Sequence, residues 1–349
     1  MKLRYLLPFL SAFLIIGCGQ NADEANTKAT AEPTAAQTEK ATPIKVGIVR
    51  VMDDAQAMLA KEGGFFEKYG LDAELIEFSS GTDLIKAIVG GQLDYGVLGF
   101  SNAFTWASKG ADLRIIGGAQ RGYHSILVRT DSGINSVADL KGKSLASQKQ
   151  GSTADIVLKG VVLDEAGLSE KDVQIMGVKP AIAVQSLVAG NVEAAFLFEP
   201  YDRIARLTAP VKEIYEIGEH WPFPCMVVIT SADTLAAKKD ILWDAMDAQR
   251  EAIDLLTQDP AKAATFISDY FIAEPTLQTL DQGEVDRNDV IEAAIRTQTF
   301  SALLSEQDIK RMYELKDIME AQGVLQPGSL DVERVINLDW QKARGITEG

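Results

Sequence analysis

The chain has 349 residues, of which 46% are hydrophobic, so it can bury the cores of two or three domains. Its formal net charge of −16 makes a polyanion such as nucleic acid a poor partner. With two histidines, two cysteines and no CxxC, HExxH, GxSxG or GxGxxG motif, the chain offers no three-histidine metal site, and we expect no cofactor.

The first eighteen residues have the features of an export signal. Lys2 and Arg4 give a positive start, an apolar run follows, and Ile15-Ile16-Gly17-Cys18 ends it. The run is too short to cross a bilayer comfortably. The last four residues resemble the lipobox of bacterial lipoproteins, which implies a lipid on Cys18; an ordinary signal peptide cut elsewhere is the alternative. Cys225 is then the one thiol left, and no internal disulfide can form.

Residues 19–42 contain no aromatic residue, Leu, Ile or Val, so they cannot bury enough surface to fold. We interpret them as a flexible tether. A folded pattern begins at Pro43, where apolar β-branched runs alternate with helical segments. The pattern predicts strands at 44–49, 73–78, 95–98 and 113–117, and helices at 55–69 and 83–90.

A predicted strand at 123–129 leaves this first unit. The second unit then contains strands at 144–146 and 173–178 and a long helix from 152 to 166. A strand at 225–230 is expected to cross back. The remaining helices, which we expect to pack on the first unit, are predicted at 241–258, 260–270, 286–295 and 306–322.

An internal repeat relates the two units. Residues 87–97 match residues 186–196 at a spacing of 99, with small, acidic and apolar positions in register. Each copy has the pattern of an amphipathic helix, a glycine stop and a buried strand, so the chain predicts two similar α/β lobes. We expect lobe 1 to contain residues 43–126 and 227–349, and lobe 2 residues 127–226.

Five motifs in this order resemble the substrate-binding proteins of ABC importers for alkanesulfonates, taurine, nitrate and thiamine-pyrimidine precursors. They run from Pro43 to about Ser231. The motifs are Gly63 to Leu71, Gly90 to Gly96, Asp139 to Lys143, Gly151 to Asp155 and Phe198 to Tyr201. The resemblance implies a type II periplasmic-binding-protein fold, in which two doubly wound lobes joined by two hinge strands close on one ligand.

Ligands of doubly wound sheets bind outside the carboxyl ends of the strands, where loops lead into helices. Free N–H groups at helix starts suit an anionic group, and Ser or Thr hydroxyls add donors. This rule nominates the loops after the strands. The candidate ligand-binding residues are Asp53, Gly81, Thr82, Phe100, Ser101, Asn102, His124, Ser152, Thr153, Glu199, Tyr201 and Trp221.

Each candidate also has a structural interpretation. Ser and Thr at helix starts serve as caps whether or not a ligand binds. Asp53 and Glu199 could hold an ammonium or amidine group, which favours a taurine-like zwitterion or an aminopyrimidine over nitrate, or Glu199 could cap its own helix. His124 could be a satisfied structural histidine, Phe100 and Tyr201 could belong to the core, and Trp221 could brace the hinge.

The sequence therefore predicts an exported, lipid-anchored receptor facing the periplasm or the cell exterior. It would bind a small polar solute, most simply an alkanesulfonate or taurine, with an aminopyrimidine or nitrate as alternatives. The expected partners are an ABC permease and the membrane, and the chain is expected to be a monomer without catalytic residues. An enzyme on the same fold and a sensory lipoprotein are the competing classes.

Overall fold

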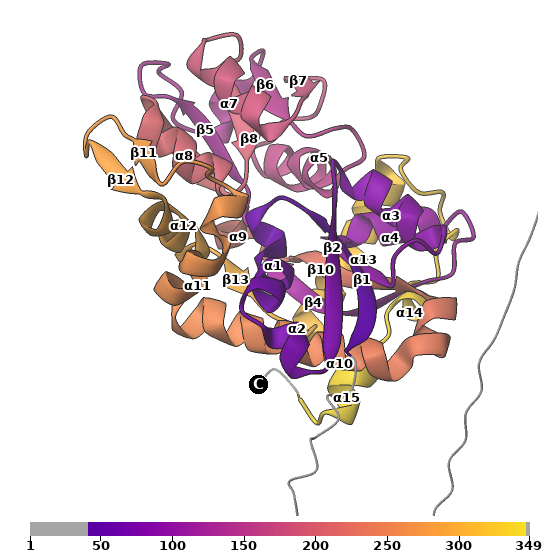
Figure 1. The fold of residues 1–349 in the computed structure, drawn as a ribbon. Coiled ribbons are helices and arrows are strands. Elements are labelled where there is room, and N and C mark those ends of the chain that lie inside the picture. Colours follow the sequence, from indigo (N-terminus) through magenta and orange to yellow (C-terminus); the bar gives the residue numbers. More distant parts are fainter. Residues whose placement is uncertain (1–40, 347–349) are drawn as a thin grey trace, which may run out of the picture. The chain divides into compact units, whose positions relative to one another are not determined.

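The computed structural model describes residues 41–346. The predicted signal peptide, Cys18 and all but the end of the predicted tether lie outside the described residues. These described residues form one compact unit. Within it, two separate β-sheets with flanking helices make up two lobes, as the repeat predicts (Figure 1).

The first sheet has the strand order β13-β4-β10-β3-β1-β2. Its strands are β1 (Thr42–Val49), β2 (Leu71–Phe78), β3 (Tyr95–Gly99), β4 (Leu113–Arg121), β10 (Pro224–Ser231) and β13 (Thr299–Phe300). Strand β10 runs antiparallel to both β3 and β4. The carboxyl ends of β1, β2, β3 and β4 therefore share one edge of the sheet.

Two groups of helices cover this sheet. One hydrophobic core joins the sheet to α1 (Ala55–Glu62), α2 (Phe65–Lys68), α10 (Ala232–Gln258), α11 (Pro260–Ile267) and α12 (Arg287–Arg296). A second core contains α3 (Gly81–Val89), α4 (Phe100–Ala107), α13 (Glu306–Ala321) and α14 (Val332–Val335). The chain then ends its described part with α15 (Asp339–Ala343).

The second sheet has the order β7-β6-β8-β5-β9. Its strands are β5 (Ser125–Arg129), β6 (Ser144–Ser147), β7 (Gln174–Gly177), β8 (Ala194–Leu197) and β9 (Val211–Glu216). Helix α5 (Thr153–Val157) continues through a π-helical turn at Leu158–Val162 into α6 (Leu163–Glu165). The helices α7 (Pro180–Val188) and α8 (Tyr201–Thr208) pack with the core that Leu127, Ala183 and Leu187 form.

The repeat has a structural meaning in both lobes. Helices α3 and α7, and strands β3 and β8, begin 99 residues apart. The acid before each strand binds the neighbouring parallel strand in the same way: Asp94 accepts a hydrogen bond from Lys45 N at 2.8 Å, and Glu193 accepts one from Ser144 N at 2.8 Å. The acidic position of the repeat therefore binds the start of the second strand of each unit to its parallel neighbour.

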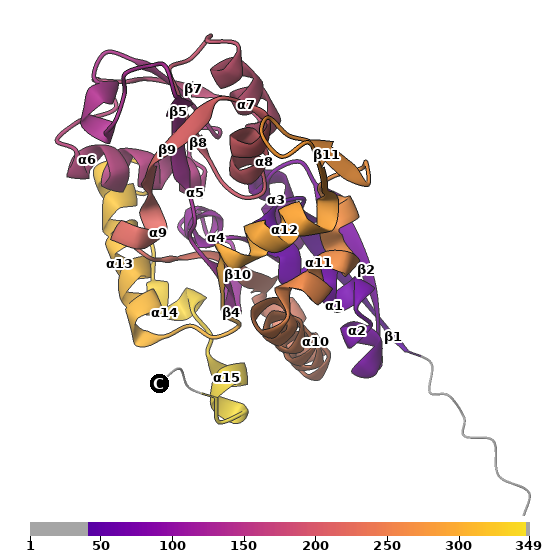
Figure 2. The same ribbon diagram turned by 90° about the vertical axis from the view of Figure 1, so that its left-hand side faces the viewer.

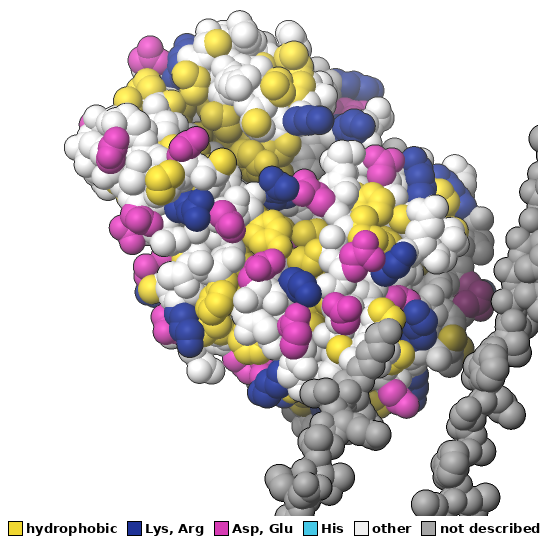
Figure 3. All heavy atoms as spheres, in the orientation of Figure 1, with side chains coloured by type: hydrophobic (Ala, Val, Ile, Leu, Met, Phe, Trp, Pro, Cys, Tyr) yellow, Lys and Arg dark blue, Asp and Glu magenta, His cyan; other side chains and the backbone are white. Residues whose placement is uncertain are grey.

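The outer faces of these two equivalent helices differ. Helix α3 exposes Thr82, Asp83 and Lys86, whereas the exposed side chains of α7 include Ile182 and Val188. Figure 3 shows apolar side chains gathered on the second lobe and mixed charges over the first. The exposed ends Val89 and Val188 lie at matching positions, one on each lobe.

Two linkers connect the lobes within the described residues. The first is the segment 122–124 between β4 and β5, and the second is 217–223, which includes α9 (Ile217–His220). They are hydrogen-bonded to each other, because Ile217 N donates to His124 O at 3.0 Å and Gly122 N donates to Phe223 O at 2.7 Å. The hinge is thus a paired set of short segments.

The linkers fall a few residues before the predicted boundaries at 126/127 and 226/227. Strand β10 lies wholly in the first sheet, paired along its length with β4, and does not itself cross.

The helical tail packs on the first lobe, as expected, but it also touches the second. Helix α13 contacts α5 through Gln322 Nε2, which donates to Ile156 O at 3.0 Å. The hairpin of β11 (Thr276–Gln278) and β12 (Glu284–Asp286) contacts α8, because Leu280 N donates to Leu207 O at 2.9 Å (Figure 2).

Candidate functional site

The loops that follow the strands of the two lobes meet each other. Ser101 Oγ, at the start of α4, lies 2.7 Å from Thr153 Oγ1, at the start of α5. Met52 N donates to Glu199 O at 3.3 Å, which joins the loop after β1 to the loop after β8. The structure therefore shows the lobes closed, with the predicted mouth loops of both in contact.

Two acids from opposite lobes are buried at this boundary. Asp53 is 2% exposed and Glu199 is fully buried. Asp53 Oδ1 has no hydrogen-bond partner among the described residues. Burial, and next the charge of Glu199, raise the pKa of Asp53 to about 8. A neutral carboxyl at this position can donate a hydrogen bond, and an ionised one can hold a cation.

The carboxylate of Glu199 has partners on both sides. Its Oε2 accepts from Arg203 N at 3.2 Å, so it caps α8, which is one of its two predicted roles. Its Oε1 accepts from Thr297 Oγ1 at 3.3 Å, across the lobe boundary. Burial, and then the charge of Asp202, raise its pKa to about 7 against the opposing effect of Arg203 and Arg206.

His124 lies in the first linker and is 2% exposed. Its ring stacks on Phe196, with centroids 5.2 Å apart, and meets Phe198 edge-on at 5.7 Å. Burial lowers the pKa of His124 to about 4, so the imidazole is neutral at pH 7. Its Nδ1 has no partner among the described residues. His124 therefore offers an aromatic face and an unused ring nitrogen.

Two further polar side chains in this region were not predicted from the sequence. Ser147 ends β6 and Gln120 lies next to the end of β4; both are buried, and Ser147 Oγ and Gln120 Oε1 lack partners within residues 41–346. Buried polar atoms without partners are uncommon and call for a bound molecule or water. A polar residue closing a buried strand was the signal that could have identified both.

The other candidates divide between the boundary and the body of the lobes. Ser152 accepts from Asp155 N at 3.2 Å and caps α5. Asn102 Nδ2 donates to Gly99 O at 3.2 Å and lies close against Gly81. Thr82 is exposed on the first turn of α3.

The aromatic candidates have core or bracing positions. Phe100 is fully buried and packs edge-on against Phe104, with centroids 5.1 Å apart. Tyr201 is half-buried and meets Phe198 at 5.7 Å. Trp221 lies against Phe223, and the guanidinium of Arg311 lies 4.9 Å from its ring centroid. Trp221 thus belongs to the second linker and contacts α13 through Arg311.

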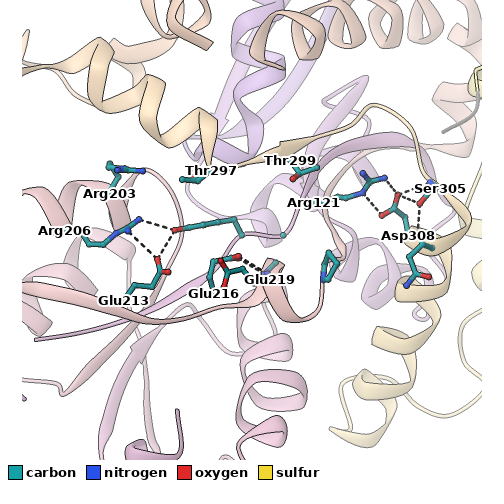
Figure 4. Close-up of a pocket in the computed structure, with 15 residues that line it drawn as sticks. Arg121, Arg203, Arg206, Glu213, Glu216, Glu219, Thr297, Thr299, Ser305 and Asp308 are labelled. Carbon is teal, nitrogen blue, oxygen red and sulfur yellow. Dashed lines mark hydrogen bonds and ion pairs between the residues drawn. The ribbon is translucent and has the colours of Figure 1, made fainter. Parts of the chain in front are cut away.

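An open cavity of about 870 Å³ lies between the lobes, beside the two linkers (Figure 4). It lies between α8 and β9 of the second lobe and the segment from Thr297 to Asp308 of the first. The residues that line it are Arg121, Gly122, Tyr123, Arg203, Arg206, Glu213, Glu216, Gly218, Glu219, Pro222, Thr297, Thr299, Ser305, Gln307 and Asp308.

The charges of this cavity are largely paired. Arg121 forms a fork with Asp308 at 2.9 and 2.7 Å. Arg206 binds Asp202 and also donates to the hydroxyl of Tyr123 at 3.3 Å. Arg203 and Arg206 lie inside α8, so a search of the loops alone missed them.

A hydrogen-bonded chain runs from Gln120 to Glu199 through Thr297, which also lines the cavity. Gln120 Nε2 donates to Gln298 Oε1 at 2.7 Å, Gln298 Nε2 donates to Thr297 Oγ1 at 3.2 Å, and Thr297 bonds Glu199. Glu199 therefore connects the predicted mouth with the cavity behind it.

Two kinds of feature are absent from the part of the chain that the structure describes. No group of three or more His, Cys, Asp or Glu side chains in residues 41–346 is arranged to hold a metal ion. None of the helices described there is both long and apolar enough to cross a membrane.

Two α/β lobes, two linkers and facing strand-end loops define a type II periplasmic-binding-protein fold. Residues 52–263 match the family described as NMT1/THI5 like. The chain belongs to this family.

Relatives of this chain are known by sequence. A Bacillus subtilis protein named for aliphatic sulfonate binding is 33% identical over 195 residues, which cover 54% of each chain. A Brucella abortus protein, named only as a binding protein, is 29% identical over 159 residues, or 45% of this chain and 48% of that one. The chain spans about half the length of these curated relatives.

A solved structure shows the same fold. The alkanesulfonate-binding protein of Xanthomonas axonopodis pv. citri, bound to MOPS, has a TM-score of 0.71 and 23% identity, covering 86% of this chain and 99% of the other. The periplasmic nitrate-binding protein of Synechocystis PCC 6803 has a TM-score of 0.69 and 17% identity, covering 87% and 88%.

Proposed function

We propose that this protein is the extracytoplasmic solute-binding component of an ABC importer. It binds one small polar organic solute between its lobes and releases it to a permease. The observation that carries the proposal is a set of four buried side chains at strand ends and in the first linker, Asp53, Gln120, His124 and Ser147, each with a polar atom that has no partner within residues 41–346. Relatives named for solute binding support it.

The charges at the boundary favour a solute with a protonated amine. Asp53 and Glu199 are both acids, and the arginines nearest to Glu199 are shared with Asp202 and the cavity. A bare anion such as nitrate would meet these acids, and the nearest guanidinium groups, those of Arg203 and Arg206, already face Glu199 at 3.9 Å. A taurine-like aminoalkanesulfonate would place its ammonium near Asp53 and its sulfonate near the hydroxyls of Ser101, Ser147 and Thr153.

A flat aminopyrimidine is the second candidate, and the surroundings of His124 favour it. The ring stack of His124 on Phe196 provides an aromatic surface. A carboxylate can accept two parallel hydrogen bonds from a protonated aminopyrimidine, and a neutral imidazole can accept a third.

The cellular setting belongs to the same proposal. A lipid on Cys18, the tether of residues 19–42 and the membrane permease would keep the receptor at the outer face of a bacterial membrane. Mass spectrometry of the protein extracted from its own cells tests the anchor, because a diacylated Cys18 adds the mass of the lipid.

A fluorescence screen tests the binding role. The four tryptophans report on lobe movement while taurine, alkanesulfonates, nitrate and an aminopyrimidine are titrated in turn. We expect saturable binding of an amino-bearing solute at one per chain, without turnover. Tight binding of nitrate or of an amine-free sulfonate would overturn the proposed ligand chemistry, and appearance of a product would overturn the binding role.

A further inference from the structure

The two buried acids of the boundary lie on opposite sides of the hinge movement. Asp53 belongs to the loop after β1 in the first lobe, and Glu199 to the loop after β8 in the second. The backbone contact of Met52 N with Glu199 O at 3.3 Å holds the two loops together. Opening the lobes separates these acids and returns them to water, so their environment depends on closure.

We propose that Asp53 is protonated when the lobes close, so that closure takes up a proton. Asp53 and Glu199 are both buried where the loops of the two lobes meet, and an ionised carboxylate that is buried without a donor is costly. The hydrogen bonds decide where the proton is held. Glu199 accepts from Arg203 N and Thr297 Oγ1, which stabilise its ionised form, whereas Asp53 Oδ1 accepts no hydrogen bond within the described residues, so Asp53 is the first of the two to be protonated.

The surrounding groups agree with this division. Asp53 interacts with Glu199, with the buried acid Asp54 and with the buried thiol of Cys225, and none of these groups supplies a positive charge. Around Glu199, the arginines partly offset the charge of Asp202. The groups that face the pair are Asp54, Cys225, Tyr123, Asp202, Arg203 and Arg206. His124 is neutral and adds no charge.

The direction of the pH effect follows from the shifts. In the closed form the pKa of Asp53 is about 8, above its ordinary value of 3.8. A raised acid pKa favours the closed form as pH falls and disfavours it as pH rises through 8. The ratio of closed to open molecules therefore falls by up to about tenfold per pH unit between pH 3.8 and pH 8, and it levels off above pH 8. The cation of a bound solute would replace the proton.

The test measures closure without any solute, so it does not depend on the proposed function. Spin labels are placed on Val89→Cys and Val188→Cys, exposed positions on α3 and α7, in the full chain with Cys18→Ser; Cys225 is buried and stays unlabelled. We expect the short-distance population to decrease from pH 6 to pH 9. Asp53→Asn should flatten this decline, because an amide takes up no proton.

Asp244→Asn is the matched control, since Asp244 is a partly buried acid on α10 whose pKa burial also raises. It should keep the parent profile. If Asp53→Asn fails to fold, infrared difference spectra of the parent between pH 6 and pH 9 should show loss of a protonated carboxyl band. A parent profile that is flat or that rises with pH, or an Asp53→Asn profile equal to the parent, would overturn the proposal. Failure of every solute to bind, with this profile intact, would instead overturn only the importer role.

Discussion

Gly99 offers a way to block closure without disturbing either lobe. It ends β3 in the first lobe, and a Cβ placed there would lie 2.2 Å from Thr153 Oγ1 of the second lobe and 3.3 Å from Thr153 Cβ. Its backbone has φ −57° and ψ 131°, which alanine adopts without strain. Gly99→Ala should therefore leave the open form intact and place a methyl group in the path of Thr153.

The size of the effect follows from the clash. Overpacking of a closed interface by one methyl group costs about 1–3 kcal/mol. The closed, solute-bound form should then weaken by roughly 5- to 150-fold in Kd. The melting temperature of the solute-free protein should not fall, because Gly→Ala at a permitted conformation adds about 0.4–1 kcal/mol of stability.

Thr153→Ala provides the matched partner, since it removes the Oγ1 that the methyl group meets. Titration calorimetry with the solute from the screen is run on the parent, both single variants and the double variant. We expect Gly99→Ala to weaken binding when Thr153 is present and to change it little when it is combined with Thr153→Ala. Equal losses in both backgrounds would show that the lobes do not meet at this contact.

Two further predictions concern the hinge. Burial lowers the pKa of His124 from 6.5 to about 4, so the buried neutral ring contributes fully to the free energy of unfolding above pH 6.5. As pH falls to 4, up to roughly 3 kcal/mol of that free energy is lost. Urea unfolding at pH 7 and pH 4.5 should show a smaller loss of unfolding free energy for His124→Phe than for the parent. Equal losses in the two proteins would contradict a buried neutral imidazole. Trp221→Phe should lower the free energy of unfolding by about 1 kcal/mol through the lost Arg311 contact, and leave solute affinity within about twofold. A large loss of affinity would place Trp221 at the ligand.

The repeat made the lobes predictable from the sequence. The spacing of 99 places Asp94 and Glu193 at equivalent crossovers, and the structure gives each the same strand contact. The edge rule for parallel strands likewise pointed to Asp53, Ser101, Thr153 and Glu199, which meet at one boundary. Such patterns are local in sequence, so they need no knowledge of tertiary packing.

The rest depended on contacts between distant segments. The strand at 225–230 was expected to cross between the lobes, but its full pairing with β4 holds it in the first sheet. Arg203 and Arg206 lie inside a helix, and only the position of α8 beside Tyr123 brings them to the cavity. Thr297 reaches Glu199 from 98 positions away. No local sequence pattern predicts these contacts between distant segments.

Closure of two lobes on a single guest is the central claim, and the distance between labels at Val89→Cys and Val188→Cys measures it directly. Titration with the solute should convert a long-distance population into a short-distance one, reaching saturation at one solute per chain. A distance distribution that stays unchanged while the solute binds would contradict the account.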